Sequence, residues 1–251
     1  MDEHQLSSAA KLIADLRRGS DRPAALPAEL SPETIAEAHH IQDLAVRLVG
    51  EPVAGWKVAG IEPGNAQRGA ILRSRLLSTP ARISSRTMPL LGYEAEVAFR
   101  VETAMPRRDT PYTRDEVVAN VSALAAIELV DSRFASYQDA PKLDRLADMM
   151  SNGALVVDEV SPGWRALDLT TIVVKVYRNS KLIHEAAGGH GNRDPVLPLL
   201  NAVNVFRLDS GLARGQFITA GSYSGLRFGA PGDTIRVTFE GLGEARAHFE
   251  P

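Results

Sequence analysis

Apolar residues recur at helical spacing in the first part of the chain. They mark one face of the segment 8–18, and Gly19 ends the pattern. Ser31 followed by a proline is typical of a helix N-cap with proline in the first turn, where the missing N–H costs nothing. We therefore expect a second helix that begins after Ser31 and ends near Val49, before a glycine. Residues 1–50 are predicted to form a helical segment that packs on the rest of the chain.

Beyond residue 50 the pattern changes to short runs of branched and alternating residues, which is typical of β-strands. The strands predicted in this way are 53–59, 94–101, 124–130, 172–177 and 234–239. Three helices are expected among them, at 113–122, 143–150 and 194–206. Strands and helices do not alternate strictly, and no internal repeat is visible. Residues 51–251 are therefore predicted to form a mixed, β-rich α+β core.

The segment from Glu94 to Val101 alternates as a strand with two different faces does. Its odd-numbered positions are apolar, whereas Glu94 and Glu96 share the opposite face. The simplest interpretation is a half-buried strand whose polar face is in solvent. The other interpretation is that the two neighbouring carboxylates hold one cation.

Glu128 and Lys57 each stand alone in an apolar run. The run 124–130 is otherwise apolar, which is typical of a strand buried on both faces. An unpaired buried carboxylate is costly, so Glu128 needs a partner. One explanation is a purely structural ion pair between Glu128 and Lys57. The alternative is that Glu128 joins Glu94 and Glu96 around one divalent metal ion.

A site built from three carboxylates favours a hard cation. Oxygen donors without His or Cys suit Mg²⁺ or Mn²⁺ and leave coordination positions open for water or substrate. Without a cation, three neighbouring carboxylates repel one another and raise one another's pKa values. A lone acid and a lone lysine in separate apolar runs, together with the Glu-x-Glu strand, favour the metal site.

Composition excludes several classes of function. The chain has 251 residues, 44% of them hydrophobic and 24% charged, which suits one large globular domain or a core with a smaller appendage. It has no cysteine, which excludes disulfides, thiolate metal sites and cysteine nucleophiles. Its 28 basic and 31 acidic residues give a net charge of −3 and no reason to expect nucleic acid or an anionic membrane. With neither a membrane-spanning run nor a secretory leader in the sequence, we expect a cytoplasmic protein.

Two glycine-rich segments and a histidine pair do not match a catalytic motif. Segment 221–225 has Tyr223 where a nucleophile elbow has serine. Segment 188–191 lacks the lysine and hydroxyl of a phosphate loop and is expected to be a turn before the next helix. His39 and His40 lie in the middle of a predicted helix and are expected to be structural.

Several short motifs, taken in order, resemble one known family. They are 38–42 (AHHIQ), 55–58 (GWKV), Gln67, 94–99 (EAEVAF), 128–133 (ELVDSR), 219–222 (TAGS), 232–233 (GD) and 242–243 (LG). The set is similar to the hydratase/decarboxylase branch of the fumarylacetoacetate hydrolase superfamily, which includes 2-keto-4-pentenoate hydratases and 2-oxo acid decarboxylases. The order and spacing hold over about residues 35 to 250.

The resemblance implies a fold and a metal centre. The family fold is a distorted, mixed β-roll or barrel with flanking helices, usually assembled into homo-oligomers. In the family, the glutamates at the positions of Glu94, Glu96 and Glu128 bind Mg²⁺ or Mn²⁺. The lysine at the position of Lys57 lies near the metal and the substrate. We expect Lys57 to be catalytic, holding the substrate carboxylate or moving a proton with a pKa lowered by burial.

The resemblance also implies a substrate pocket. Its expected substrate-binding residues are Gln67, Arg133, Ser151 and Ser222.

The chain departs from the family pattern at two places. Met149 and Met150 replace small or polar residues beside the expected pocket. Arg73 and Arg75 are additional in the loop after Gln67, and they would suit a further carboxylate on the substrate. These changes leave the expected metal ligands intact.

The expected activity is that of a metal-dependent lyase. The preferred hypothesis is a hydratase for a 2-hydroxydienoic or 2-oxoenoic acid of the 2-keto-4-pentenoate type, acting through a metal-stabilised enolate in aromatic compound catabolism. The alternatives are a 4-oxalocrotonate-type decarboxylase, an acylpyruvate-type hydrolase with His190 as the nearest general base, and a non-catalytic partner subunit. The expected partners are the small-molecule acid, other copies of the chain and a pathway enzyme, with neither nucleic acid nor membrane.

Overall fold

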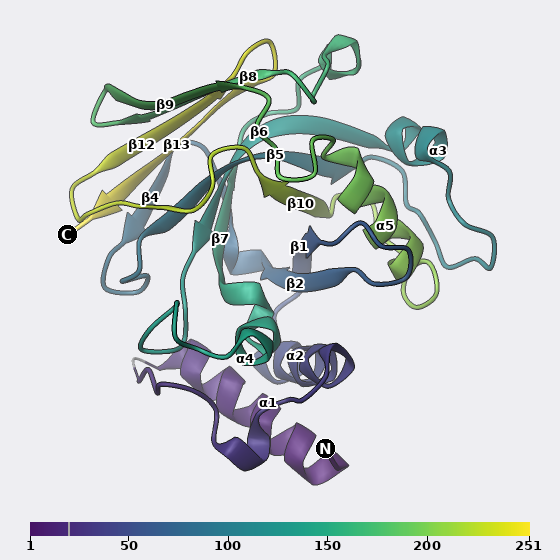
Figure 1. Ribbon diagram of the computed structural model, residues 1–251, viewed down its shortest axis with the longest axis vertical. Helices are drawn as coiled ribbons and strands as arrows, with labels where there is room; N and C mark the ends of the chain where they lie inside the picture. The colour runs from purple at the N-terminus through teal and green to yellow at the C-terminus, as the bar shows by residue number, and fades with distance from the viewer. Residues whose placement is uncertain (20) are drawn as a thin grey trace.

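A computed structural model describes residues 1–19 and 21–251 of the protein. Two β-sheets form the centre, two longer helices and one short helix lie below them, and two further helices lie at the right-hand side in this view (Figure 1). The helices are α1 (Glu3–Arg18), α2 (Ile35–Val49), α3 (Arg114–Ala119), α4 (Lys142–Ala147) and α5 (Val196–Phe206). The longer strands are β1 (Val53–Ala59), β2 (Gln67–Leu72), β5 (Gly92–Val101), β6 (Val121–Val130), β7 (Asn152–Val157), β8 (Val173–Arg178), β9 (Lys181–Ala187), β10 (Phe217–Ser222), β12 (Thr234–Phe239) and β13 (Gly243–Glu250). The shorter strands are β3 (Leu76–Ser78), β4 (Ala81–Ser84) and β11 (Arg227–Phe228).

The larger sheet curls into a half-barrel, and its inner surface carries the candidate site. Its strand order is β2-β1-β10-β5-β6-β7-β3, with β11 paired to β5. The curl brings β2 close to β7 across the concave side. The smaller sheet has the order β4-β13-β12-β8-β9 and packs against the convex side of β6. This architecture confirms the predicted mixed α+β fold with a distorted β-roll core and flanking helices.

The alternation predicted for β5 is confirmed, but its polar face is not in solvent. Ala95, Val97 and Phe99 lie in the main apolar core, which fills the space between the two sheets. On the other face, Ala98 belongs to a smaller apolar cluster inside the half-barrel, and Glu96 is only 1% exposed. The interpretation of a solvated polar face is therefore wrong.

The N-terminal helices pack on α4 and the segment around Phe134, and α2 also packs directly on β2. Ile13 of α1 and Ile41 of α2 meet Phe134 and Leu146 in one apolar cluster. Because Leu146 belongs to α4, this cluster fixes α4 between the helical layer and β2 (Figure 1). No helix in the described ranges is long and apolar enough to cross a membrane.

The second helix begins later than predicted. Its N-cap is Thr34, whose hydroxyl accepts from the Glu37 amide while the Glu37 side chain accepts from the Thr34 amide. This reciprocal pair satisfies two amides at once and outweighs the signal from Ser31. The Ser31 hydroxyl instead donates to Asp144, at 2.5 Å. The predicted end is confirmed, since Gly50 ends the helix with a left-handed backbone (φ 77°).

The other predicted elements are confirmed with small shifts, and several strands were missed. The first helix begins five residues before the predicted start, behind an N-cap at Asp2. Strands β2, β7, β10 and β13 were not predicted, although they build much of both sheets. Strand β7 is buried along its whole length, whereas β13 alternates with the small residues Ala245 and Ala247 at buried positions, which give a weak apolar signal.

Candidate active site

Three carboxylates meet on the inner surface of the half-barrel. Glu94 and Glu96 point inward from β5, and the register of the antiparallel pair puts Glu94 directly beside Glu128 of β6. Each of the three offers an oxygen within 4.8 Å of the others. Glu128, like Glu96, is 1% exposed. The structure thus brings together the three residues that the sequence singled out as metal ligands.

The carboxylate cluster is electrostatically strained without a counter-charge. Burial and the neighbouring Glu128 raise the pKa of Glu94. Burial and the charges of Glu128 and Glu94 raise the pKa of Glu96 well above its ordinary value. Each shift means that placing a negative charge at that carboxyl costs more than it does in water.

Lys57 faces the same space from β1. Its ammonium forms an ion pair with Glu128. Burial by itself would lower the pKa of Lys57, but the charges of Glu128, Glu94 and Glu96 outweigh it and the pKa is raised. The expectation of a pKa lowered by burial is therefore wrong, and Lys57 is held as a cation.

The ion pair and the carboxylate cluster exist side by side. When all four groups are ionised, three carboxylates and one ammonium leave an excess of two negative charges. The pair with Lys57 therefore does not neutralise the cluster, and two positive charges are needed for balance. A divalent cation supplies that charge, and an all-oxygen donor set suits a hard ion.

Two hydroxyl side chains of β10 border the cluster. The Ser222 hydroxyl interacts with the Glu94 carboxylate and lowers its pKa, against the larger effect of burial. Thr219 lies beside Lys57 in the parallel pairing of β10 with β1, and its backbone also pairs with β5. Its fully buried hydroxyl has no hydrogen-bond partner among the described residues. Thr219 is not among the predicted site residues, although an isolated threonine in an apolar strand is a usable signal.

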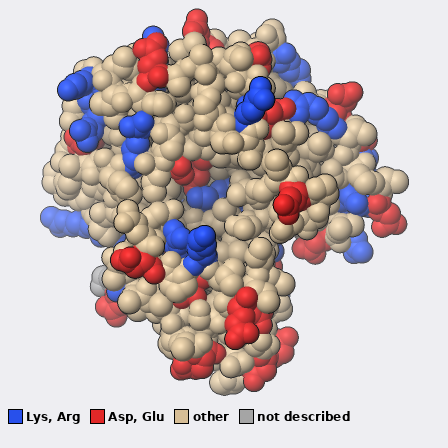
Figure 2. Space-filling view, in the orientation of Figure 1, with Lys and Arg blue, Asp and Glu red and all other residues tan. Residues whose placement is uncertain are grey.

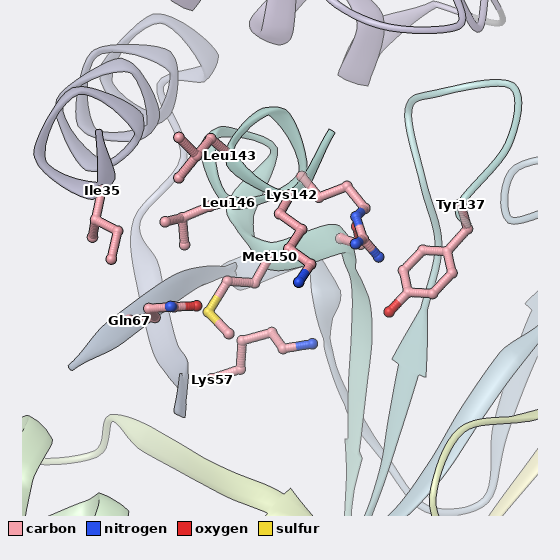
Figure 3. A pocket seen from close by; sticks show the side chains of 10 residues that line it. Ile35, Lys57, Gln67, Tyr137, Lys142, Leu143, Leu146 and Met150 are labelled. Carbon is pink, nitrogen blue, oxygen red and sulfur yellow. The ribbon is translucent and has the colours of Figure 1, made fainter. Parts of the chain in front are cut away.

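A pocket of about 460 Å³ opens beside Lys57, between the half-barrel and the helical layer (Figures 2 and 3). That volume is in the range of small-molecule sites. The lining residues are Ile35, Lys57, Gln67, Tyr137, Lys142, Leu143, Arg145, Leu146, Met150 and Ser151. Two of the predicted substrate-binding residues, Gln67 and Ser151, are among them. Tyr137, Lys142 and Arg145 were not predicted as site residues.

A left-handed turn presents Met150 and Ser151 to this pocket. Three consecutive residues from Met149 to Ser151 have positive φ angles of 52°, 53° and 56°. For residues other than glycine this conformation costs roughly 1–2 kcal/mol each. Gly69 of β2 permits it, because a Cβ there would lie 2.3 Å from the Met149 carbonyl oxygen. Such strain is typical of functional sites, where surrounding structure enforces an unusual geometry.

Arg133 lies in a buried ionic network and not in the pocket lining. Its guanidinium pairs with Asp131 and Asp148, both at 3.2 Å, and donates to the Asn152 carbonyl. Arg17 of α1 pairs with the same Asp148 at 2.9 Å. The network anchors the helical layer to the residue that precedes the left-handed turn. This geometry favours a structural role for Arg133 over the predicted substrate contact.

Two other expected groups also lie outside the pocket lining. Arg73 and Arg75 form a short 3₁₀ segment after β2 and do not line the pocket. Nε2 of the buried His190 ring lies 3.0 Å from the Ala220 carbonyl oxygen, and Nδ1 accepts a hydrogen bond from the Asn192 amide. Both ring nitrogens are thus occupied by the backbone, and burial lowers the pKa of His190.

Comparison with curated proteins finds relatives of two enzyme types, while no family model matches the chain. The 2-keto-4-pentenoate hydratase of Paraburkholderia phymatum is 27% identical over 215 residues, which cover 80% of this chain and 79% of the relative. The 2-keto-4-pentenoate hydratase of Paraburkholderia xenovorans is 29% identical over 167 residues, 62% of this chain and 58% of the relative. The 4-oxalocrotonate decarboxylase of Pseudomonas putida is 26% identical over 158 residues, 62% of this chain and 59% of the relative.

Solved structures share the fold. A 4-oxalocrotonate decarboxylase from Pseudomonas putida G7, complexed with magnesium and adipate, superposes with a TM-score of 0.81 over 99% of this chain and 98% of that one, at 18% identity. A fumarylacetoacetate hydrolase from Exiguobacterium antarcticum gives a TM-score of 0.59 over 80% of this chain and 76% of that one, at 17% identity. The sequence relatives and the shared fold thus support the resemblance of this chain to the hydratase/decarboxylase branch of the fumarylacetoacetate hydrolase superfamily.

Proposed function

We propose that the protein is a divalent-metal-dependent hydratase acting on a 2-hydroxydienoic or 2-oxoenoic acid. The observation that carries the proposal is the cluster of the half-buried Glu94 with the buried Glu96 and Glu128, which has an excess of two negative charges when ionised and lies beside a pocket that Lys57 lines. The names of the sequence relatives, chiefly 2-keto-4-pentenoate hydratases, support the choice of reaction.

Glu94, Glu96 and Glu128 would hold the metal ion. Mg²⁺ and Mn²⁺ both suit three carboxylates and no nitrogen or sulfur donor. When bound, such an ion supplies Lewis-acid stabilisation for the negative charge that develops on the 2-oxygen of the substrate.

Lys57 would act as a cation at the start of the reaction. In the metal-free protein the three carboxylates raise the pKa of Lys57, so its ammonium can pair with the substrate carboxylate or donate a proton. Gln67 and Ser151 line the same pocket with amide and hydroxyl groups that can orient an oxygen-rich substrate. Hydration adds one proton and one hydroxyl group, both from water, across the carbon–carbon double bond.

A decarboxylase of 2-oxo dicarboxylic acids is the second candidate. It is favoured by the curated 4-oxalocrotonate decarboxylase relative, and it needs the same stabilisation of charge on the 2-oxygen. The metal ligands alone do not separate the two reactions, because both pass through a similar distribution of charge.

The remaining two candidates have less support. Hydrolysis of an acylpyruvate needs a base that activates water, and both ring nitrogens of His190 are already bonded to the backbone. A non-catalytic subunit would have no need for an unneutralised carboxylate cluster beside a pocket.

A steady-state assay separates these candidates. Loss of the ultraviolet absorbance of 2-hydroxypenta-2,4-dienoate, dependent on added Mg²⁺ or Mn²⁺ and abolished by a chelator, supports the hydratase. Release of CO₂ from an unsaturated 2-oxo dicarboxylic acid as the only turnover would favour the decarboxylase. Absence of turnover of short 2-oxo acids with either metal would support the non-catalytic subunit.

Other properties follow from the family resemblance alone. We propose assembly into homo-oligomers and a place in the catabolism of aromatic compounds, together with a pathway enzyme. Sedimentation of the purified protein tests the first of these directly.

A further inference from the structure

The pocket carries cations on two separate walls. Lys57 rises from β1, while Lys142 reaches in from the opposite side, where it begins α4 (Figure 3). Arg145 lies one turn further along α4 and lines the same pocket. The chain has only five lysines, and two of them line this one cavity.

The cations of α4 are not neutralised by the protein. The ten lining residues include three basic side chains and no acid. Lys57 is paired with Glu128, but in the described ranges neither Lys142 nor Arg145 forms a salt bridge. The Nε of Arg145 is buried without a hydrogen-bond partner there. Two free positive charges on adjacent turns of one short helix repel each other, so an anion between them would be stabilised.

The neighbours of Arg145 hold its guanidinium at the cavity. Its Cζ lies 4.8 Å from the centre of the Tyr137 ring, in a cation–π contact. Tyr137 itself lines the pocket and directs its hydroxyl toward it (Figure 3). Leu146 and Met150 add apolar surface to the same cavity, beside Lys142 and Lys57 (Figure 3).

We infer that Lys142 and Arg145 form a second anion subsite, which selects a substrate with a second carboxylate at the end remote from the metal. This inference rests on the proposed function, which assigns the first carboxylate to the side of the metal and Lys57. The preferred ligand is then a 2-oxo dicarboxylic acid whose carbon chain lies along Leu146 and Met150. The sequence suggested that Arg73 and Arg75 would bind a further substrate carboxylate. In this inference Lys142 and Arg145 of α4 bind it instead.

The subsite also bears on the reaction. A carboxylate between two cations is stabilised as an anion, and its release as neutral CO₂ would remove the charge that these cations stabilise. The subsite therefore favours a reaction that retains both carboxylates, as hydration of the double bond does.

Binding of saturated 2-oxo acids tests the subsite without turnover. Calorimetry in the presence of Mg²⁺ compares 2-oxoadipate with 2-oxohexanoate, which differ only in the terminal carboxylate. The matching five- and seven-carbon pairs test shorter and longer carbon chains. We expect the best diacid to bind about tenfold or more tightly than its monoacid, as one charge-assisted contact provides. Lys142→Gln combined with Arg145→Gln should remove this preference and leave the affinities for the monoacid and Mg²⁺ within about twofold.

The control is Lys181→Gln, which removes an exposed lysine of β9 outside the pocket lining and should keep the full preference. Equal binding of diacids and monoacids by wild type, or a preference that survives in the double variant, would overturn the subsite while leaving the metal centre in place. A wild-type protein that binds no Mg²⁺ would overturn the proposed function and this inference with it.

Discussion

Replacing Glu128 by glutamine removes one charge from the centre of the carboxylate cluster and keeps the shape of the side chain. In the wild type, three ionised carboxylates and the ammonium of Lys57 leave an excess of two negative charges for a bound cation to balance. In Glu128→Gln the excess falls to one, one of the three anionic donors is lost, and Lys57 loses its nearest partner. A divalent ion is then under-compensated and poorly held.

The effect on activity should be large and the effect on folding small. We expect kcat/KM to fall at least about 100-fold, which corresponds to roughly 2.7 kcal/mol of lost transition-state stabilisation. Breaking an isolated buried ion pair costs about 3–5 kcal/mol of stability. Here the loss should be smaller, because the substitution also relieves repulsion on Glu94 and Glu96, which still attract the Lys57 ammonium.

Activity, Mg²⁺ affinity and metal-free thermal unfolding of the same preparation separate the two roles. Glu240→Gln is the matched control, since it removes an exposed carboxylate that lies outside the cluster and the pocket lining, and it should change none of the three. Turnover of Glu128→Gln within a few-fold of wild type would refute the reasoning. So would a variant that unfolds while the wild type binds no metal, because Glu128 would then serve only the ion pair.

Three further predictions follow. Lys57→Gln should lower kcat by about 10²–10⁴-fold while Mg²⁺ binding, followed by calorimetry, is retained or strengthened, since the three carboxylates stay; loss of metal binding would contradict this. The raised pKa of Glu96 means that the metal-free folded protein holds a proton that the unfolded chain gives up near pH 4.5, so the stability of the metal-free protein should fall as pH rises above that value. The stabilisation by Mg²⁺ should grow over the same range, because Mg²⁺ binds the deprotonated carboxylate. Melting curves with Mg²⁺ or with chelator between pH 5 and 8 check both trends, and a Mg²⁺ stabilisation that shrinks as pH rises would contradict the prediction. Gly69→Ala places a Cβ 2.3 Å from the Met149 carbonyl oxygen. It should lower the free energy of unfolding, measured with denaturant, by about 1–3 kcal/mol and should also reduce turnover. Unchanged stability and turnover would mean that the left-handed turn adapts to the added methyl group.

The carboxylate cluster could be predicted because its signals are local. Strict alternation fixed which face of β5 carries Glu94 and Glu96, and an acid inside an apolar strand marked Glu128. The three carboxylates meet because β5 and β6 are neighbours in the sheet. The two interpretations offered for Glu128 were both correct as geometry, since Lys57 and the other carboxylates reach it together.

The pocket wall could not be predicted in the same way. Helix α4 has six residues, and which of its side chains face the cavity is set by packing against α1 and α2, which are distant in sequence. Lys142 and Arg145 therefore look like ordinary surface cations in the sequence. Arg133 shows the converse, because its buried partners Asp131 and Asp148 are visible only once the chain is folded.

The predicted direction of the Lys57 pKa shift was wrong for a physical reason. Burial was weighed without the charges that surround the side chain, and three carboxylates reverse the sign of the pKa shift. A lysine beside an acidic cluster should be taken as a cation unless a bound metal has already neutralised the acids.

Anomalous scattering from crystals grown with Mn²⁺ tests the central claim most directly. The account predicts one strong peak per chain, within bonding distance of carboxylate oxygens from Glu94, Glu96 and Glu128. A map with no peak among these three side chains, or with its only peak elsewhere, would contradict it.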